Sequence, residues 1–292
     1  MSLFRKKFHF KNNHVFITGA ASGIGRQLSK DFYFKEHCHL TILDKNLKGL
    51  EILKKDLEDV GNPSHRSQKI KILHCDLSSK KNFEKAIEEI ADHPLDILIN
   101  NAGVTYSGLF EKSKIEDFET VIETNLMGTV RLTKALLPKL LESKNGAIVN
   151  ISSLGGLIGM PGMVAYSTSK FGVVGFSEAL SLELKDRVAV CTICPAFVKT
   201  QIASHSILGP LSHGEGEDDR VHKMNRIVKK FGSNPEKASH TIIQAIVHKK
   251  KLTLINPDAH AFYLLKKFVP SFNDSLIYRV YKKLMNQGVF HP

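Results

Sequence analysis

An α/β fold built around one parallel sheet is predicted by two features of the sequence. Short apolar segments of the strand type alternate with helix-like segments along the chain, which is the order that produces parallel strands joined by helices. The chain has 292 residues, of which 42% are hydrophobic, so it can bury a large core. We therefore expect one principal domain rather than separate helical and strand domains.

The first strand-like segment, residues 14–18, leads into a glycine-rich turn and then into a helix expected over residues 26–35. The turn reads Gly19-Ala-Ala-Ser-Gly23-Ile-Gly25. Glycines at such a junction allow a tight turn and a close backbone approach to a pyrophosphate. The start of the helix adds free N–H groups and a favourable dipole. This junction predicts a dinucleotide site.

The second strand, residues 38–43, ends at Asp44, nineteen residues after Gly25. An acidic residue at this distance can accept hydrogen bonds from the adenosine ribose. The carboxylate repels a 2′-phosphate and therefore favours NAD over NADP, although the adjacent Lys45 weakens this preference. The simpler alternative is that Asp44 is a turn residue at the end of a strand.

The remaining elements continue the alternation. Helices are expected over residues 47–60, 80–91 and 115–141, and strands over residues 69–74, 95–99, 147–151, 188–194 and 251–255. Asp76 and the segment 100–103 each follow a strand, so they are expected at the same sheet edge as the glycine turn. Asn125 lies mid-helix among apolar neighbours. A buried amide needs hydrogen bonds, so it either stabilises the core or belongs to the site.

Tyr166 and Lys170 are four residues apart, which places both side chains on one face of a helix. A cation beside a phenol favours the phenolate and lowers its pKa toward the range useful for acid–base catalysis. Ser153 follows directly after the strand 147–151 and Ser152, and the glycine-rich return that comes next can bring its hydroxyl to the tyrosine. The alternative for a bare Tyr–Lys pair is an ordinary helix surface, but the serine and the glycine turn favour a catalytic group.

Together these motifs resemble the short-chain dehydrogenase/reductase family over roughly residues 12–256. The matching elements are TGAASGIG at 18–25, Asp76, NNAG at 100–103, Asn125, Ser153, the Tyr166–Lys170 motif, and Pro195 with Thr200. The resemblance implies a doubly wound Rossmann-type sheet of seven parallel strands in the order 3-2-1-4-5-6-7. Helices would cover both faces, and a nicotinamide cofactor would lie across the carboxyl edge.

The resemblance also implies roles for individual residues. Tyr166 would exchange the proton with the substrate oxygen, Lys170 would lower the tyrosine pKa and bind the nicotinamide ribose, Ser153 would hold the substrate oxygen, and Asn125 would anchor a water in the proton relay. Cofactor contacts are expected from Gly19, Ser22, Gly23, Ile24, Gly25, Asp44, Asp76, Leu77, Asn101, Ala102, Gly103, Tyr166, Lys170, Pro195, Val198 and Thr200. One departure is Ala196, because the family usually has glycine after this proline.

The substrate is expected to be a neutral, hydrophobic alcohol or ketone. Besides Ser153, which would hold the substrate oxygen, the positions expected to line its pocket are apolar and include no Arg or Lys that could bind a carboxylate; they are Leu154, Gly155, Met160, Met163, Phe197 and Ile202. Residues 204–234 have no strand pattern and read as a mobile lid over cofactor and substrate.

The sequence predicts no metal site, no disulfide framework and no membrane span. Cys191 and Cys194 lie three residues apart in a strand, so they point to opposite faces and are expected in the core. The basic N-terminus lacks an apolar leader segment, and no apolar run reaches the length of a membrane helix. We expect a cytoplasmic protein, with peripheral contact at an anionic membrane surface as an open alternative.

The residues beyond 256 form a second region, a basic helical extension over 257–292 that follows a cofactor-binding and catalytic domain over 1–256. Residues 221–292 carry 13 Lys and Arg against 3 Asp and Glu, out of a chain net charge of +12. Ala261, Leu264, Leu265 and Phe268 form one helical stripe; Leu276, Ile277, Val280, Tyr281 and Leu284 form another. These stripes either pack on the domain or a partner subunit, or face an anionic membrane.

Two hypotheses of different classes follow. The first is an NAD-dependent oxidoreductase, with NADP as the alternative cofactor, that assembles as a homodimer or homotetramer. The second is a catalytically silent protein on the same fold that senses nucleotides or binds a membrane surface. A complete Asn125, Ser153, Tyr166 and Lys170 set favours the enzyme. Nucleic-acid binding is not expected, because no recognition module accompanies the basic charge.

Overall fold

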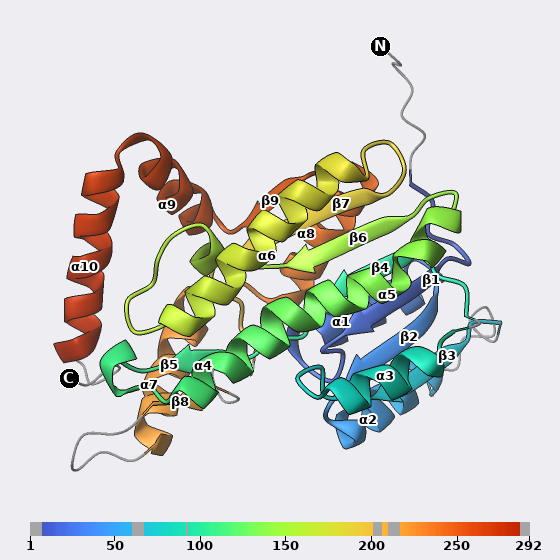
Figure 1. The fold of residues 1–292 in the computed structure, drawn as a ribbon, viewed down its shortest axis with the longest axis horizontal. Helices are drawn as coiled ribbons and strands as arrows, with labels where there is room; N and C mark the ends of the chain where they lie inside the picture. Colours follow the sequence, from blue (N-terminus) through green and yellow to red (C-terminus); the bar gives the residue numbers. More distant parts are fainter. Residues whose placement is uncertain (1–7, 60–66, 92, 201–205, 210–216, 287–292) are drawn as a thin grey trace.

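One parallel sheet organises the structure, a computed structural model that describes residues 8–59, 67–91, 93–200, 206–209 and 217–286. Within these residues seven strands pair in the order β3-β2-β1-β4-β6-β7-β9 (Figure 1). They are β1 His14–Thr18, β2 His39–Asp44, β3 Ile70–His74, β4 Ile97–Asn100, β6 Ala147–Ile151, β7 Ala189–Pro195 and β9 Leu252–Ile255. The doubly wound α/β sheet is thereby confirmed, together with its strand order.

The direction of winding reverses at β1. Val15 pairs with Leu40 of β2 on one side and with Ile97 of β4 on the other. The strands β2 and β3 therefore lie on one side of β1, and β4, β6, β7 and β9 lie on the other. At such a switch point the connections leave in opposite directions and open a crevice at the carboxyl ends of the strands. The glycine turn after β1 lies at this edge.

Helices cover both faces of the sheet because neighbouring strand residues point to opposite sides. Val15 and Ile17 belong to a core that contains residues of α1, α2 and α8, whereas Phe16 belongs to the core on the other face, with residues of α3 and α5. The first set of helices is α1 Gly23–Phe34, α2 Leu47–Glu58 and α8 Pro235–Val247; the second includes α3 Lys80–Glu88, α5 Gly128–Glu142 and α6 Val164–Glu183.

The single helix expected over residues 115–141 is interrupted. The chain forms α4 Ile115–Ile122, a π-helical turn at Glu123–Met127, and then α5. In the π turn the N–H of Gly128 donates to the carbonyl of Glu123, five residues earlier. The physical reason lies at Asn125, whose side chain bonds to a neighbouring loop, and π turns of this kind occur frequently at functional sites.

The expectation of no strand in residues 204–234 is wrong for its first part. Residues Ile207–Leu208 form β8, which pairs in parallel with β5 Tyr106–Ser107 in a small second sheet, and Glu217–Phe231 form the helix α7. The described part of the chain also contains two 3-10 turns, at Phe110–Lys112 and Leu154–Gly156. Residues 201–205 and 210–216, with the expected pocket residue Ile202, lie outside the described residues.

The C-terminal extension consists of α9 Pro257–Phe268 and α10 Pro270–Asn286, and the two helices form a hairpin that projects beyond the end of the sheet (Figure 1). Its inner side packs on the domain: Ala259, Phe262 and Ile277 contact the cluster around Leu154 and Ile158. Among the described residues, no helix is both long and apolar enough to cross a membrane.

Candidate active site

The glycine turn between β1 and α1 accepts only glycine at its tightest points. Gly19 and Gly23 have φ angles of +65° and +53°. A Cβ on Gly25 would lie 2.2 Å from the carbonyl oxygen of Gly19 and 2.6 Å from Nδ2 of Asn101. The Ser22 side chain does not cap α1, so the N–H groups at the start of this helix face an open edge. The turn therefore fits a pyrophosphate.

Hydrogen bonds join the ends of β1 and β4 beside this turn. Thr18 Oγ1 accepts from the N–H groups of Asn101 and Ala102, both at 2.9 Å. The Asn101 amide donates to the carbonyl oxygens of Thr18 and Gly19, at 2.9 and 3.2 Å. This part of the segment 100–103 fixes the floor of the crevice.

The two acidic residues at strand ends have different neighbours. Asp44 Oδ2 accepts from the N–H of Ala21 in the glycine turn at 3.0 Å, and its Oδ1 accepts from the N–H of Asn46 at 3.0 Å. Asp76 Oδ1 accepts instead from the N–H and hydroxyl of Ser78, at 2.9 and 2.7 Å. Asp44 is thus held against the glycine turn, and its carboxylate stays partly exposed at the crevice.

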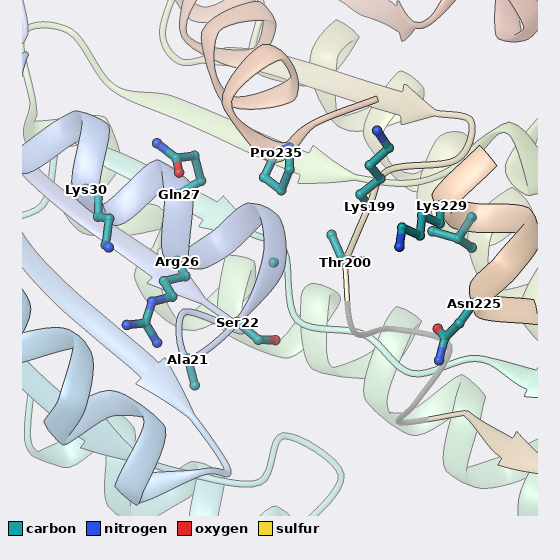
Figure 2. A pocket seen from close by; sticks show the side chains of 12 residues that line it. Ala21, Ser22, Arg26, Gln27, Lys30, Lys199, Thr200, Asn225, Lys229 and Pro235 are labelled. Atoms are coloured by element: carbon teal, nitrogen blue, oxygen red, sulfur yellow. The ribbon is translucent and has the colours of Figure 1, made fainter. Parts of the chain in front are cut away.

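A cavity of about 530 Å³ adjoins the glycine turn (Figure 2). Its lining includes Ser22 and Gly23 from the turn, Thr200 from the segment after β7, and side chains of α1 and α7. Four of the lining residues are basic and none is acidic; the basic ones are Arg26, Lys30, Lys199 and Lys229. Such a lining attracts anionic groups, although Arg26 also binds Asp56 at 2.6 Å.

The segment after β7 closes over the turn. A Cβ added to Gly23 would lie 2.9 Å from Cγ2 of Thr200, so these two residues are in close contact. Pro195 is buried at the end of β7, and Val198 forms a bridge with Ser233. Neither Asp44 nor Tyr166 lines the cavity, which therefore adjoins the glycine turn without reaching the strand-end acid or the tyrosine.

Tyr166, Lys170 and Ser153 meet at the carboxyl end of β6, as the sequence predicts. The Ser153 hydroxyl lies near enough to the Tyr166 phenol to oppose the rise of the tyrosine pKa. Lys170 Nζ lies 5.8 Å from the centre of the tyrosine ring and donates to the carbonyl oxygen of Ile151 at 2.9 Å. The tyrosine and the lysine are buried, at 8% and 4% exposure.

Burial dominates the ionisation of this group. It raises the pKa of Tyr166, against the opposing effect of the hydrogen bond from Ser153. It also lowers the pKa of Lys170 to about 8. The sequence argument expected the lysine to lower the tyrosine pKa, but the loss of solvent around the phenol is the larger effect in this structure.

Asn125 is connected to the same group through its side chain. Its Oδ1 accepts from the N–H of Val104 at 2.8 Å, and its Nδ2 donates to the Val104 carbonyl and to Ser169 Oγ, both at 2.9 Å. A Cβ on Gly103 would lie 3.1 Å from Asn125 Oδ1 and 3.4 Å from Lys170 Nζ. Gly103 therefore allows the amide and the ammonium to approach each other.

An apolar cluster surrounds the tyrosine. Met163 packs with Tyr166, and Met160 joins them from the glycine-rich return. The sequence analysis missed the residues that α7 and α10 add to this cluster, namely Met224, Ile227 and Met285, although the stripe in α10 correctly included Tyr281 and Leu284. Contacts between helices so distant in the sequence can be found only in the folded chain.

Two expected substrate residues lie elsewhere. Leu154 packs under α9 and α10 with Ala259 and Ile277, and Ala196 joins that second cluster. The Phe197 ring is 37% exposed and belongs to neither cluster. The buried environments of Cys191 and Cys194 confirm their assignment to the core. The described residues contain no group of His, Cys, Asp and Glu that could hold a metal ion.

The sequence of this chain is similar to those of known proteins. Residues 13–208 match the family described as short chain dehydrogenase. "Dehydrogenase/reductase SDR family member 7B" of Xenopus tropicalis is 32% identical over 82% of this chain and 76% of its own length. "3-Ketodihydrosphingosine reductase" of Bacteroides thetaiotaomicron is 31% identical over 80% of this chain and 84% of its own.

Two solved structures share the fold and carry nicotinamide cofactors. A short chain dehydrogenase/reductase from Burkholderia phymatum, in complex with NAD, has a TM-score of 0.76 at 25% identity and covers 89% of this chain and 94% of its own. A short-chain dehydrogenase from Sphingobium yanoikuyae, in complex with NADPH, has a TM-score of 0.69 at 25% identity, over 94% and 95% of the two chains.

Proposed function

Because the chain belongs to the short-chain dehydrogenase/reductase family of NAD(P)-dependent oxidoreductases, we propose that it interconverts a neutral, hydrophobic alcohol and its ketone, with Tyr166 as the general acid and base. The observation that carries this proposal is the group formed by the buried Tyr166 and Lys170 with the half-buried Ser153 at the carboxyl edge of the sheet. A phenol is useful there because it can give or take one proton at the substrate oxygen.

The bound nicotinamide supplies the hydride in reduction and accepts it in oxidation. In reduction, Tyr166 gives its proton to the carbonyl oxygen as that oxygen becomes an alcohol. Ser153, whose hydroxyl is near the phenol, would hold the same oxygen in place with a hydrogen bond and keep its own proton. In oxidation Tyr166 takes the proton back.

Lys170 and Asn125 would assist the proton transfer at Tyr166 and would not act on the carbonyl carbon of the substrate. The ammonium of Lys170 stabilises the phenolate that remains after proton transfer. Asn125 is held by Val104 and Ser169 at a π turn, next to Gly103 and within reach of Lys170. From that position it can anchor a water through which the tyrosine regains its proton.

For the cofactor we propose NAD rather than NADP. Asp44 lies against the glycine turn, where its carboxylate can accept hydrogen bonds from ribose hydroxyls and would repel a 2′-phosphate. Lys45 follows it and is exposed, which leaves a cation near the position of that phosphate. The preference therefore depends on which of the two side chains faces the ribose.

The substrate class is inferred from the apolar cluster at Tyr166. Its methionines are flexible and can adapt to a long aliphatic or polycyclic chain. A relative named 3-ketodihydrosphingosine reductase, from Bacteroides thetaiotaomicron, agrees with such a substrate.

We further propose self-association as a homodimer or homotetramer, because α6 carries the exposed apolar side chains Val164, Phe171 and Leu182. Light scattering of the purified protein tests this assembly.

A panel of aliphatic, steroid and long-chain acyl-derived alcohols, assayed with NAD⁺ and NADP⁺, tests the proposed reaction. We expect turnover with hydrophobic secondary alcohols and a higher kcat/KM with NAD⁺. Turnover restricted to small, charged hydroxy acids would contradict the substrate class. Absence of turnover with the whole panel, together with normal NADH binding, would instead favour a silent nucleotide-binding protein.

A further inference from the structure

The hairpin of α9 and α10 has an outer apolar surface. In the described part of these helices, and at the residue joining them, six large apolar side chains are between 46% and 71% exposed. We call these six side chains together the α9–α10 patch. Leu264, Phe268, Val269 and Phe272 belong to α9, the joining residue and the start of α10, whereas Tyr278 and Val280, two residues apart, lie on different sides of α10. Single exposed apolar residues are ordinary, but six on one hairpin mark an interaction surface.

Apart from Tyr278, whose ring centre lies 6.4 Å from that of Tyr281, this patch is separate from the contacts that attach the hairpin to the domain. The hairpin packs inward through Ala259, Phe262 and Ile277, and through Tyr281 and Leu284 near Tyr166. The sequence stripe in α9 includes Leu264 and Phe268, which turn outward instead. The side chains of the patch therefore stay exposed, whereas the inner side of the hairpin is covered by the domain.

Basic side chains accompany the patch. Lys266, Lys267, Arg279, Lys282 and Lys283 belong to these two helices, against Asp258 and Asp274. Lys267 Nζ lies 5.7 Å from the ring centre of Phe268, and Lys282 Nζ lies 5.1 Å from that of Tyr278. Lysines that extend along exposed aromatic rings present a charged end and an apolar body on the same side, which suits the headgroup region of a bilayer.

The positive charge of the two helices also indicates whether a second copy of the chain or a bilayer would bind the patch. If a second copy of the chain bound through the same patch, its lysines and arginine would face the lysines and arginine of the first copy. Each copy has only two carboxylates in these helices to balance them, so repulsion between like charges disfavours this contact. An anionic bilayer complements both the charge and the apolar side chains. Each basic residue near such a surface contributes on the order of 1 kcal/mol, screened by salt.

We propose that the α9–α10 patch docks the protein on an anionic lipid bilayer. Docking is peripheral: Phe268 and Phe272 enter the boundary between headgroups and acyl chains, and the lysines contact the anionic headgroups. The inner face of α10 forms part of the apolar cluster at Tyr166, so the docked enzyme would present that cluster close to the membrane. This inference concerns the surface and does not depend on the substrate.

Flotation of the full chain with phosphatidylcholine vesicles, with and without phosphatidylserine, tests the proposal. We expect binding to the anionic vesicles that weakens with salt. The double variant Phe268→Ser with Phe272→Ser, and the double variant Lys267→Glu with Lys282→Glu, should each lower the vesicle partition coefficient by at least ~10-fold. Activity on a water-soluble alcohol should stay unchanged.

A matched control replaces exposed residues of the same types elsewhere. Phe231→Ser at the end of α7 and Lys144→Glu before β6 should leave vesicle binding unchanged. Failure of the wild-type protein to bind anionic vesicles, or equal loss of binding in the control variants, would overturn the proposal. It would also be overturned if the patch variants dissociated an oligomer in light scattering without any vesicle binding, because the occupant would then be a second copy.

Discussion

At Tyr166, burial and hydrogen bonding act on the phenol in opposite directions. Burial raises its pKa, whereas the Ser153 hydroxyl lowers it. The Tyr–Lys spacing in the sequence correctly predicted that phenol and ammonium would share one face of a helix. It could not predict the balance of these effects, because burial depends on helices α7 and α10, which come from elsewhere in the chain.

The pH dependence of carbonyl reduction follows from Lys170. Its pKa is lowered to about 8 by burial, so the ammonium is charged below that pH and loses its proton above it. Tyr166, with its raised pKa, keeps its proton through neutral pH. We expect kcat/KM for ketone reduction at saturating NADH to be level below pH 8 and to fall above it. A profile that stays level to pH 10 would contradict the role given to Lys170.

The cofactor preference is tested at Asp44. Replacing it in Asp44→Ala removes the carboxylate that would repel a 2′-phosphate, so the preference for NADH over NADPH should shrink by at least ~10-fold in Kd, about 1.4 kcal/mol. Fluorescence titration with both cofactors measures it. The control variant Lys45→Ala should instead weaken NADPH alone. If Asp44→Ala leaves the ratio unchanged, the carboxylate acts only as a partner of Ala21 and Asn46.

At the scale of elements, the turn between β1 and α1 requires a residue without a Cβ at position 25. In Gly25→Ala the new methyl would meet the Gly19 carbonyl at 2.2 Å, so the turn must open and the pyrophosphate site with it. We expect NADH affinity to fall by at least ~10-fold. Gly175→Ala is the control in α6, because nothing lies within 4 Å of its Cβ. It should leave NADH binding intact and raise stability by up to ~1 kcal/mol.

The contribution of α10 to the active site is tested with two aromatic residues of that helix. Tyr281 packs in the cluster at Tyr166, whereas Phe272 is 54% exposed. Tyr281→Ala should raise KM for a long-chain alcohol several-fold, because about 25 cal/mol is lost per Å² of apolar contact, and leave KM for a short alcohol almost unchanged. Phe272→Ala should change neither KM in the absence of vesicles. Equal effects of the two variants would show that α10 does not contact the substrate.

Some elements could not be predicted from the sequence for identifiable reasons. The periodicity of residues 115–141 is continuous, but the bonds of Asn125 to Val104 and Ser169 occur with a π turn that splits the helix. The strands β5 and β8 have two residues each, too short for any pattern. Their pairing joins segments about a hundred residues apart.

For the whole molecule, the sequence was most informative where one residue type is required by local geometry. The strand order followed from the glycine turn, the strand-end acids and the Tyr–Lys pair, because these motifs identify the family and hence the topology. The C-terminal hairpin has no such motif. Its stripes predicted helices, but only the folded chain places Tyr281 inward and Phe268 outward.

The central claim is that Tyr166 transfers the proton in a reaction of a bound nicotinamide. The variant Tyr166→Phe keeps the ring in the apolar cluster and removes only the hydroxyl. Single-turnover reduction should therefore slow by at least ~100-fold, while fluorescence titration gives the same NADH affinity as the wild-type protein. A variant that binds NADH normally and still reduces the ketone at close to the wild-type rate would contradict the account.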